Sequence, residues 1–279
     1  MAINLDATEI PGLSESQDTE KFHTSTEIEN IYRCAKIERD WLSNPEMPSG
    51  YVITNFHATL FENVPAYLKK GMVPLQPGRY RIDDIRVTGE ARNFYVSGLD
   101  VKPLMQSYTK ELDERLSGLP TLPVSHTEEI MHEAAWAYYT FIRIHPYLDG
   151  NGRVGRMLLK RVLSGSGFRD IMYSQQLLKG KKFEENREQH LKAMNSVDKT
   201  GNLSYLEIYL AKLLLSRYSP KDGSIYQELE DFIDNKTKEV EVQKEKMKLT
   251  SIWQSFTGVN IEGGEESTEG EEYPRSENK

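Results

Sequence analysis

The strongest constraint on the fold is a stripe of apolar residues that recur at helical spacing in the middle of the chain. Its members are Ile130, Met131, Ala134, Ala135, Tyr138, Phe141 and Ile142. Ser125-His126-Thr127-Glu128 precedes them and matches a capping box, which predicts where the helix begins. Pro146 disfavours helical backbone at His145, so the helix should end there. The sequence therefore predicts a long core helix that places His145 at its C-terminal end.

A second core helix should follow after a short glycine-rich turn. Val154, Leu158 and Val162 recur at helical spacing, so Gly150 and Gly152 lie where that helix begins. A helix start offers unpaired N–H groups and a partial positive charge, and glycines let an anion approach that backbone closely. The turn therefore has the features of an anion-binding site.

Charged side chains crowd into the same dozen residues. Arg153 and Arg156 are three positions apart, so they share a face of the second helix, and neither loses its charge near neutral pH. Asp149 is a carboxylate suited to a hard cation, and His145 is a candidate general base. We interpret the stretch 145–156 as a polyphosphate cradle, with the base on one side and the cation ligand on the other.

Composition narrows the class of protein. The chain has 279 residues, a hydrophobic content of 38% and a formal net charge of -8, which is ordinary for a soluble globular protein and argues against a general nucleic-acid binder. Cys34 is the only cysteine, so no internal disulfide forms and a reducing compartment is the simpler expectation. Residues 1–13 lack the pattern of a secretory signal, and no apolar run approaches membrane-spanning length. We expect a cytoplasmic protein without membrane or nucleic-acid partners.

The remaining patterns are mainly helical. Only 82–87 and 94–96 are rich in strand formers, with turn residues after each, and they predict a small β-hairpin. We predict four segments: a flexible leader at 1–20, the main domain at 21–219, a charged helical extension at 220–260 and an acidic disordered tail at 261–279.

Three interpretations compete for the central stretch. Gly150, Gly152 and Gly155 fit the dinucleotide fingerprint G-x-G-x-x-G, but that motif needs a strand before the first glycine, and residues 134–142 have a helical period. The P-loop pattern is absent, because neither Lys-Ser nor Lys-Thr follows these glycines. A plain turn between two core helices explains the glycines but not the histidine, carboxylate and arginines beside them.

The stretch resembles the signature of the Fic (filamentation induced by cAMP) family, His-Pro-Phe-x-Asp/Glu-Gly-Asn-Gly-Arg-x-x-Arg. This sequence matches every specified position except Tyr147, which replaces the usual phenylalanine. Tyr80-Arg81, the long helix before the motif and the segment 183–203 also resemble the family's arrangement, over roughly residues 20 to 218. The resemblance implies a mainly α protein, with a Fic-type helical core and a small β-hairpin flap.

Fic proteins mostly transfer AMP from ATP to a protein hydroxyl, so the resemblance implies a protein adenylyltransferase that uses ATP and Mg²⁺. His145 would be the catalytic base that accepts the proton of a Ser, Thr or Tyr hydroxyl as its oxygen attacks the α-phosphorus. Asp149 would hold Mg²⁺. The remaining nucleotide-binding residues would be Gly150, Asn151, Gly152, Arg153, Gly155 and Arg156. The Asn151 side chain would be among the phosphate ligands.

Two further parts of the site are implied by the resemblance. The flap, which docks the target segment by backbone pairing, would comprise Ile85, Arg86, Val87 and Thr88. His190 and Leu191 stand where related proteins carry a pair of tyrosines beside the adenine. This departure leaves the base preference open.

A second, shorter resemblance lies near the N-terminus. Ser25, Glu29 and Asn30 match the family's inhibitory pattern, Ser/Thr-x-x-x-Glu-Gly/Asn, on a helix predicted over about 24–42. A Glu29 carboxylate paired with Arg156 would occupy the guanidinium that should grip the γ-phosphate, so that ATP would bind unproductively. The resemblance therefore implies autoinhibition by Glu29.

Other functions stay open at this point. A Doc-like enzyme would transfer phosphate, but Doc-type motifs typically carry lysine at the position of Gly152. Removal of AMP from a modified protein and non-catalytic sensing of ATP are the remaining alternatives. The expected partner is a protein substrate with a hydroxyl side chain, the chain itself included, and the charged C-terminal helix is compatible with a homodimer.

Overall fold

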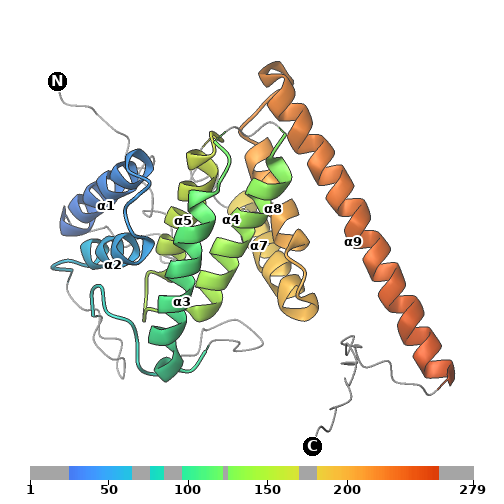
Figure 1. Cartoon of the computed structure of the whole chain (residues 1–279), viewed down its shortest axis with the longest axis horizontal. Helices are drawn as coiled ribbons and strands as arrows, with labels where there is room; N and C mark the ends of the chain where they lie inside the picture. Colours follow the sequence, from blue (N-terminus) through green and yellow to red (C-terminus); the bar gives the residue numbers. More distant parts are fainter. Residues whose placement is uncertain (1–24, 65–75, 85–95, 122–124, 170–180, 258–279) are drawn as a thin grey trace, which may run out of the picture. The chain divides into compact units, whose positions relative to one another are not determined.

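The computed structural model describes residues 25–64, 76–84, 96–121, 125–169 and 181–257, and these residues are mainly helical (Figure 1). The helices are α1 (Ser25–Ser43), α2 (Ser49–Leu60), α3 (Gly98–Ser117), α4 (Thr127–Ile144), α5 (Asn151–Gly165), α7 (Lys181–Thr200), α8 (Ser204–Leu215), the 3₁₀ helix η2 (Pro220–Asp222) and α9 (Ser224–Thr257). The predicted mainly α fold is confirmed. The predicted β-hairpin is not seen in the described part of the chain, and most of it, residues 85–95, lies outside that part.

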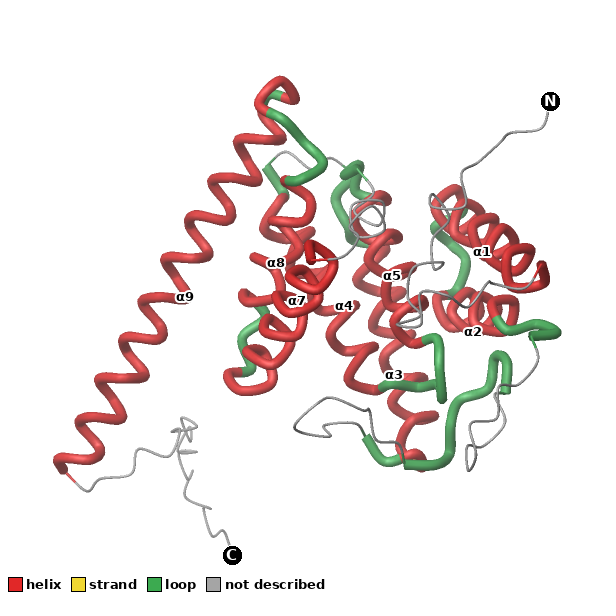
Figure 2. Tube along the Cα trace, turned by 180° about the vertical axis from the view of Figure 1, so that it is seen from behind, coloured by secondary structure: helices red, strands yellow, loops and turns green. Residues whose placement is uncertain are grey.

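Helices α4 and α5 pack against each other at the centre of the domain, as Figures 1 and 2 show from opposite sides. Ile130, Ala134 and Phe141 on α4 are fully buried, and Val154 and Leu158 on α5 are at most 1% exposed. The apolar stripes predicted from the sequence are therefore the faces that form the core. Helices α3 and α8 pack against α4, whereas α1 and α2 pack against α5.

The start of α4 differs from its prediction. His126, not Ser125, is the N-cap residue, and no side-chain capping bond forms there. Ser125 has a left-handed backbone, with φ of 73°. Because the helix begins one residue later than the capping box requires, Glu128 is the second helical residue rather than the third, and it cannot reach back to complete the box.

The chain divides into two compact units, residues 1–236 and 237–279, and the division falls within α9. Leu229, Phe232 and Ile233, on the first turns of α9, belong to the hydrophobic core of the first unit. Among the described helices, none combines the length and the apolar character that crossing a bilayer requires.

Candidate active site

His145 lies at the C-terminal end of α4 in a left-handed backbone conformation, with φ of 49° and ψ of 61°. Its backbone N–H donates to the carbonyl of Phe141, 3.0 Å away, and so closes the last turn of the helix. Its Nδ1 is 3.3 Å from the carbonyl oxygen of Ile142. Because a carbonyl only accepts, Nδ1 carries the ring proton, and Nε2 is left with a lone pair. The histidine is therefore in the tautomer that a general base needs.

The electrostatic surroundings keep His145 neutral. Burial lowers the pKa of His145 from 6.5 to about 4, and the positive charges of Arg81 and Arg143 lower it further, against opposing effects from the Ile142 carbonyl and Asp149. A neutral imidazole at physiological pH is able to accept a proton.

The loop after His145 is held by the side chain of Asn151, which is 3% exposed. Its Oδ1 accepts from the N–H of Tyr147 at 3.0 Å, and its Nδ2 donates to the carbonyl of Tyr147 at 2.8 Å. Both polar ends of the amide are thus used within the protein. In the structure this side chain fixes the loop, and its predicted role as a phosphate ligand stays a prediction. The backbone N–H of Asn151 lies at the start of α5, where helix N–H groups have no partner within the helix.

His57 on α2 supports the same loop and is 1% exposed. The N–H of Gly78 donates to its Nδ1 at 2.9 Å, so Nε2 carries the proton and donates to the carbonyl of Asp149 at 3.1 Å. Its ring also stacks on Tyr147. No sequence pattern marks His57, because a histidine on a helix has no periodicity or motif that indicates such a role.

Gly150 is the N-cap of α5 and has φ of 80°, a region that residues with a side chain rarely adopt. A Cβ at this position would lie 2.7 Å from Cε2 of Phe61. The glycine therefore lets the chain turn tightly against α2 and begin α5 at Asn151. The first N–H groups of α5, which include those of Asn151 and Gly152, have no partner within the helix and are the donors available to an anion.

Asp149 and Arg153 flank this helix start. The Asp149 side chain is 62% exposed, and its Oδ2 lies 3.9 Å from Nη2 of Arg153. The Arg153 guanidinium carbon lies 4.8 Å from the centre of the Phe61 ring, a cation–π contact. The described residues contain no cluster of three or more His, Cys, Asp or Glu side chains suited to a metal. One exposed carboxylate nevertheless fits Mg²⁺, which is usually held by one or two carboxylates together with substrate phosphates.

Arg156 and His190 form the other end of the site. Burial lowers the pKa of Arg156 to about 10, so its guanidinium stays charged at neutral pH. Nε2 of His190 is 3.1 Å from the hydroxyl of Tyr138, and its ring centre is 5.4 Å from that of Tyr209. Burial, followed by the positive charge of Arg156, lowers the pKa of His190 to about 4. The predicted adenine neighbour and the predicted phosphate ligand therefore lie close together, and half-buried Leu191 follows on α7.

Gly155, predicted to bind nucleotide, faces α4. A Cβ there would lie 2.9 Å from Cε2 of Tyr138 and 3.1 Å from Cδ1 of Ile142. This glycine allows α4 and α5 to approach closely, and we assign it to helix packing.

The predicted inhibitory helix, α1, packs against α5. Asn30 is 2% exposed and donates to the carbonyl of Glu62 at 2.7 Å, which ties α1 to the end of α2. Farther along, the buried carboxylate of Glu38 accepts from Lys160 Nζ of α5 at 2.9 Å. Glu29 lies on the same helix and is exposed. Ser25 is the first residue of α1, and the four flap residues at 85–88 lie outside the described part of the chain.

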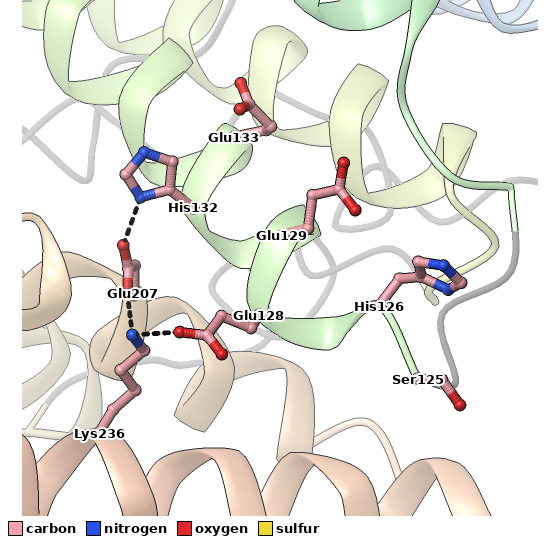
Figure 3. Close-up of a pocket in the computed structure, with 8 residues that line it drawn as sticks. All are labelled: Ser125, His126, Glu128, Glu129, His132, Glu133, Glu207 and Lys236. Carbon is pink, nitrogen blue, oxygen red and sulfur yellow. Dashed lines mark hydrogen bonds and ion pairs between the residues drawn. The ribbon is translucent and has the colours of Figure 1, made fainter.

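Away from the candidate active site, a pocket with a volume of about 400 Å³ lies at the start of α4 (Figure 3). Its lining carries charged groups that pair with one another: Glu207 Oε1 lies 2.9 Å from His132 Nδ1, and Lys236 Nζ lies 2.6 Å from Glu128 and 3.9 Å from Glu207. Glu207 is 3% exposed, so these partners offset the loss of its hydration. We assign the cluster a structural role that joins α4, α8 and the start of α9.

Comparison with known proteins gives the same family as the motif. Residues 50–163 match the model of the Fic/DOC family. The protein adenylyltransferase Fic of Nematostella vectensis is 29% identical over 102 residues, which is 36% of this chain and 21% of that protein. The Drosophila persimilis protein of the same name is 31% identical over 104 residues, which is 37% of this chain and 18% of that protein. The matched part thus spans only about a fifth of these relatives.

Solved structures of Fic domains are also similar. A Fic domain containing signaling protein from Bacteroides thetaiotaomicron is 18% identical, with a TM-score of 0.48, and the alignment covers 79% of this chain and 76% of that one. The matched segment 50–163 contains His57, His145 and the whole loop between α4 and α5. Residues 50–163 therefore match the Fic/DOC family, and this segment contains the motif.

Proposed function

We propose that this protein is an adenylyltransferase that transfers AMP from ATP to a Ser, Thr or Tyr hydroxyl of a target protein. The observation that carries the proposal is the state of His145: its Nδ1 faces the Ile142 carbonyl oxygen at 3.3 Å, which places the lone pair of the ring on Nε2, and burial lowers its pKa to about 4. The helix start of α5, five residues after Pro146, supplies N–H donors for phosphate beside that base.

In the proposed reaction, Nε2 of His145 takes the proton of the target hydroxyl as the hydroxyl oxygen attacks the α-phosphorus of ATP. The bond between the α-phosphorus and its bridging oxygen breaks, and pyrophosphate leaves. The N–H groups at the start of α5 and the guanidinium groups of Arg153 and Arg156 stabilise the phosphate charge. Asp149 would hold Mg²⁺, which supplies further charge neutralisation when it is bound with ATP.

Autoinhibition by Glu29 is the second part of the proposal. It is supported by the position of α1 against α5, the helix that carries Arg153 and Arg156. The negative charge of Glu27, two residues before Glu29, acts on Arg153, so the start of α1 lies near that arginine.

The test uses labelled ATP with purified protein and a cell lysate. We expect Glu29→Gly to increase AMP incorporation, and we expect His145→Ala in the same background to abolish it while ATP still binds. Asp40→Gly is the matched control, because Asp40 is another exposed acidic residue on α1 and the glycine weakens the helix equally. Equal incorporation by Glu29→Gly and Asp40→Gly contradicts the inhibitory role.

Mass spectrometry of the modified protein separates the remaining alternatives. An added AMP supports the proposal, whereas an added phosphate indicates a Doc-like kinase. If no protein in the lysate, nor the chain itself, gains either group, a non-catalytic role in ATP binding is favoured.

A further inference from the structure

We infer that Arg81 is a positioning residue for the reaction, which holds the backbone around His145 in the conformation that the base needs. This inference rests on the proposed adenylyltransferase function. Arg81 lies in the segment between α2 and α3, outside the motif, and its side chain is buried, with the residue 4% exposed. A buried arginine needs compensating hydrogen bonds, so its partners indicate what it does.

Those partners include three consecutive carbonyls that surround His145. The guanidinium donates from Nη2 to Ile144 at 3.2 Å and from Nε to His145 at 2.7 Å. The backbone N–H of Arg81 donates to Pro146 at 2.9 Å. The last carbonyls of a helix have no partner within it, and here Arg81 supplies that partner where α4 ends.

The remaining donors of Arg81 reach two other parts of the chain. Nη1 donates to the carbonyl of Asp83 at 2.8 Å, and Nη2 donates to that of Val96 at 2.8 Å. Nearby, Oδ1 of Asp84 accepts from the N–H of Gly98 at 2.8 Å, and its charge favours the charged form of Arg81. One guanidinium thus donates to four carbonyls. Its five N–H donors in a planar arrangement permit this geometry, whereas a lysine ammonium with three donors does not.

This arrangement matters because His145 has a left-handed backbone. For a residue with a side chain that conformation costs roughly 1–2 kcal/mol, so the surrounding contacts must maintain it. The conformation is also what lets Nδ1 reach the Ile142 carbonyl and leaves Nε2 as the acceptor. Loosening the carbonyls of residues 144–146 should therefore change the orientation and the tautomer of the imidazole.

The groups that act on the His145 ring besides Arg81 are Arg143, Asp149 and the Ile142 carbonyl. None of them is altered when Arg81 becomes lysine, and the positive charge is kept. The substitution Arg81→Lys therefore tests the fork of donors rather than the charge.

The experiment compares Arg81→Lys with Arg161→Lys, in the natural chain and in the Glu29→Gly background. Arg161 is another buried arginine, 6% exposed, but it lies toward the end of α5 over the Trp41 ring. We expect Arg81→Lys to lower kcat about 100-fold, as misplacement of a catalytic group by about 1 Å does, with KM for ATP changed less than about threefold. A kcat within about threefold of the Arg161→Lys value overturns the inference.

A second variant and a second measurement keep the inference testable. Asp84→Ala removes the neighbouring carboxylate without touching Arg81, and should lower kcat about 10-fold at similar KM. If Arg81→Lys does not fold, an unchanged kcat in Asp84→Ala overturns the inference.

Nitrogen-15 NMR of the histidine rings at neutral pH, with His145 assigned from His145→Ala, reports the tautomer without any catalysis. We expect Nδ1–H in the natural chain, and a shift toward Nε2–H in Arg81→Lys or in Asp84→Ala. Identical ring signals in the variants overturn the role of Arg81. Absence of AMP transfer in every protein, together with the expected NMR shift, contradicts the proposed function and leaves the positioning role intact.

Discussion

The imidazole of His57 lies flat on the ring of Tyr147, with their centres 3.6 Å apart and their planes inclined by 6°. The same imidazole accepts from the N–H of Gly78 and donates to the carbonyl of Asp149. His57 thereby joins helix α2 to the active-site loop, although it lies outside the motif. The bond from Gly78 requires the neutral ring, because a protonated Nδ1 cannot accept from it.

The first prediction concerns stability against pH. Burial lowers the pKa of His57 from 6.5 to about 4, so below pH 6.5 the unfolded chain takes up a proton that the folded chain refuses. Stability is therefore lost as pH falls from about 6.5 to 4, and His57 should account for about 2 kcal/mol between pH 7 and 4.5.

Urea unfolding at the two pH values tests this, and His57→Gln should reduce the loss by that amount. His126→Gln replaces an exposed histidine and serves as the control. Equal losses in both variants would rule out His57 as the source. Part of the loss should persist in His57→Gln, since burial also lowers the pKa of His145 and His190 to about 4.

The second prediction concerns the residue at which this chain departs from the family motif. Tyr147 is fully buried, and its hydroxyl forms no well-formed hydrogen bond among the described residues, although the nearby Thr54 side chain partly opposes the burial that raises the pKa of Tyr147. Tyr147→Phe restores the usual residue and should raise the free energy of unfolding by about 1 kcal/mol, because an unsatisfied buried hydroxyl is removed. Activity should be unchanged, since the ring contacts remain.

Tyr108→Phe is the matched control for that measurement. Tyr108 is also buried, but its hydroxyl donates to the carbonyl of Ala137 at 2.8 Å. Removing it should lower the free energy of unfolding by about 1 kcal/mol, the opposite sign. Chemical denaturation of both variants decides the matter, and destabilisation by Tyr147→Phe would show that its hydroxyl has a partner.

A third prediction follows from the crossing of α4 and α5. A Cβ at Gly155 would meet the Tyr138 ring at 2.9 Å, so Gly155→Ala should destabilise the fold by about 1–3 kcal/mol through overpacking. Gly201→Ala is a useful comparison because a Cβ there meets nothing within 4 Å, although its φ of 69° adds backbone strain. In thermal unfolding, Gly155→Ala should lower the midpoint temperature of the transition, even though alanine favours helix. A higher midpoint contradicts the packing role.

The sequence could predict the helices because their apolar stripes repeat at a fixed spacing, and it could predict His145 and its loop because a dozen consecutive residues carry the chemistry. It could not predict His57 or Arg81. Their roles arise from hydrogen bonds to backbone carbonyls about 64 to 92 residues away, and backbone acceptors leave no trace in residue type. Asn151 and Gly155 show a different limit of sequence analysis. A motif identifies a residue, but it does not say whether the residue contacts substrate or stabilises the fold.

Asn151 gives the sharpest test of that distinction. In Asn151→Asp the carboxylate still accepts from the N–H of Tyr147, but it cannot donate to the Tyr147 carbonyl, and it adds a buried negative charge at the start of α5. We expect kcat for AMP transfer to fall by about 10 to 100-fold, with a weaker affinity for ATP.

Asn202→Asp is the matched control, because the Oδ1 of Asn202 accepts from the N–H of Ser204 and an aspartate keeps that bond. The further variant Asn151→Ala separates the two effects, since it loses the support of the loop but adds no charge. If Asn151 holds the loop, Asn151→Ala should lower kcat with little change in ATP affinity measured by calorimetry. A loss of ATP affinity in Asn151→Ala as large as that in Asn151→Asp would instead show that the side chain binds phosphate directly.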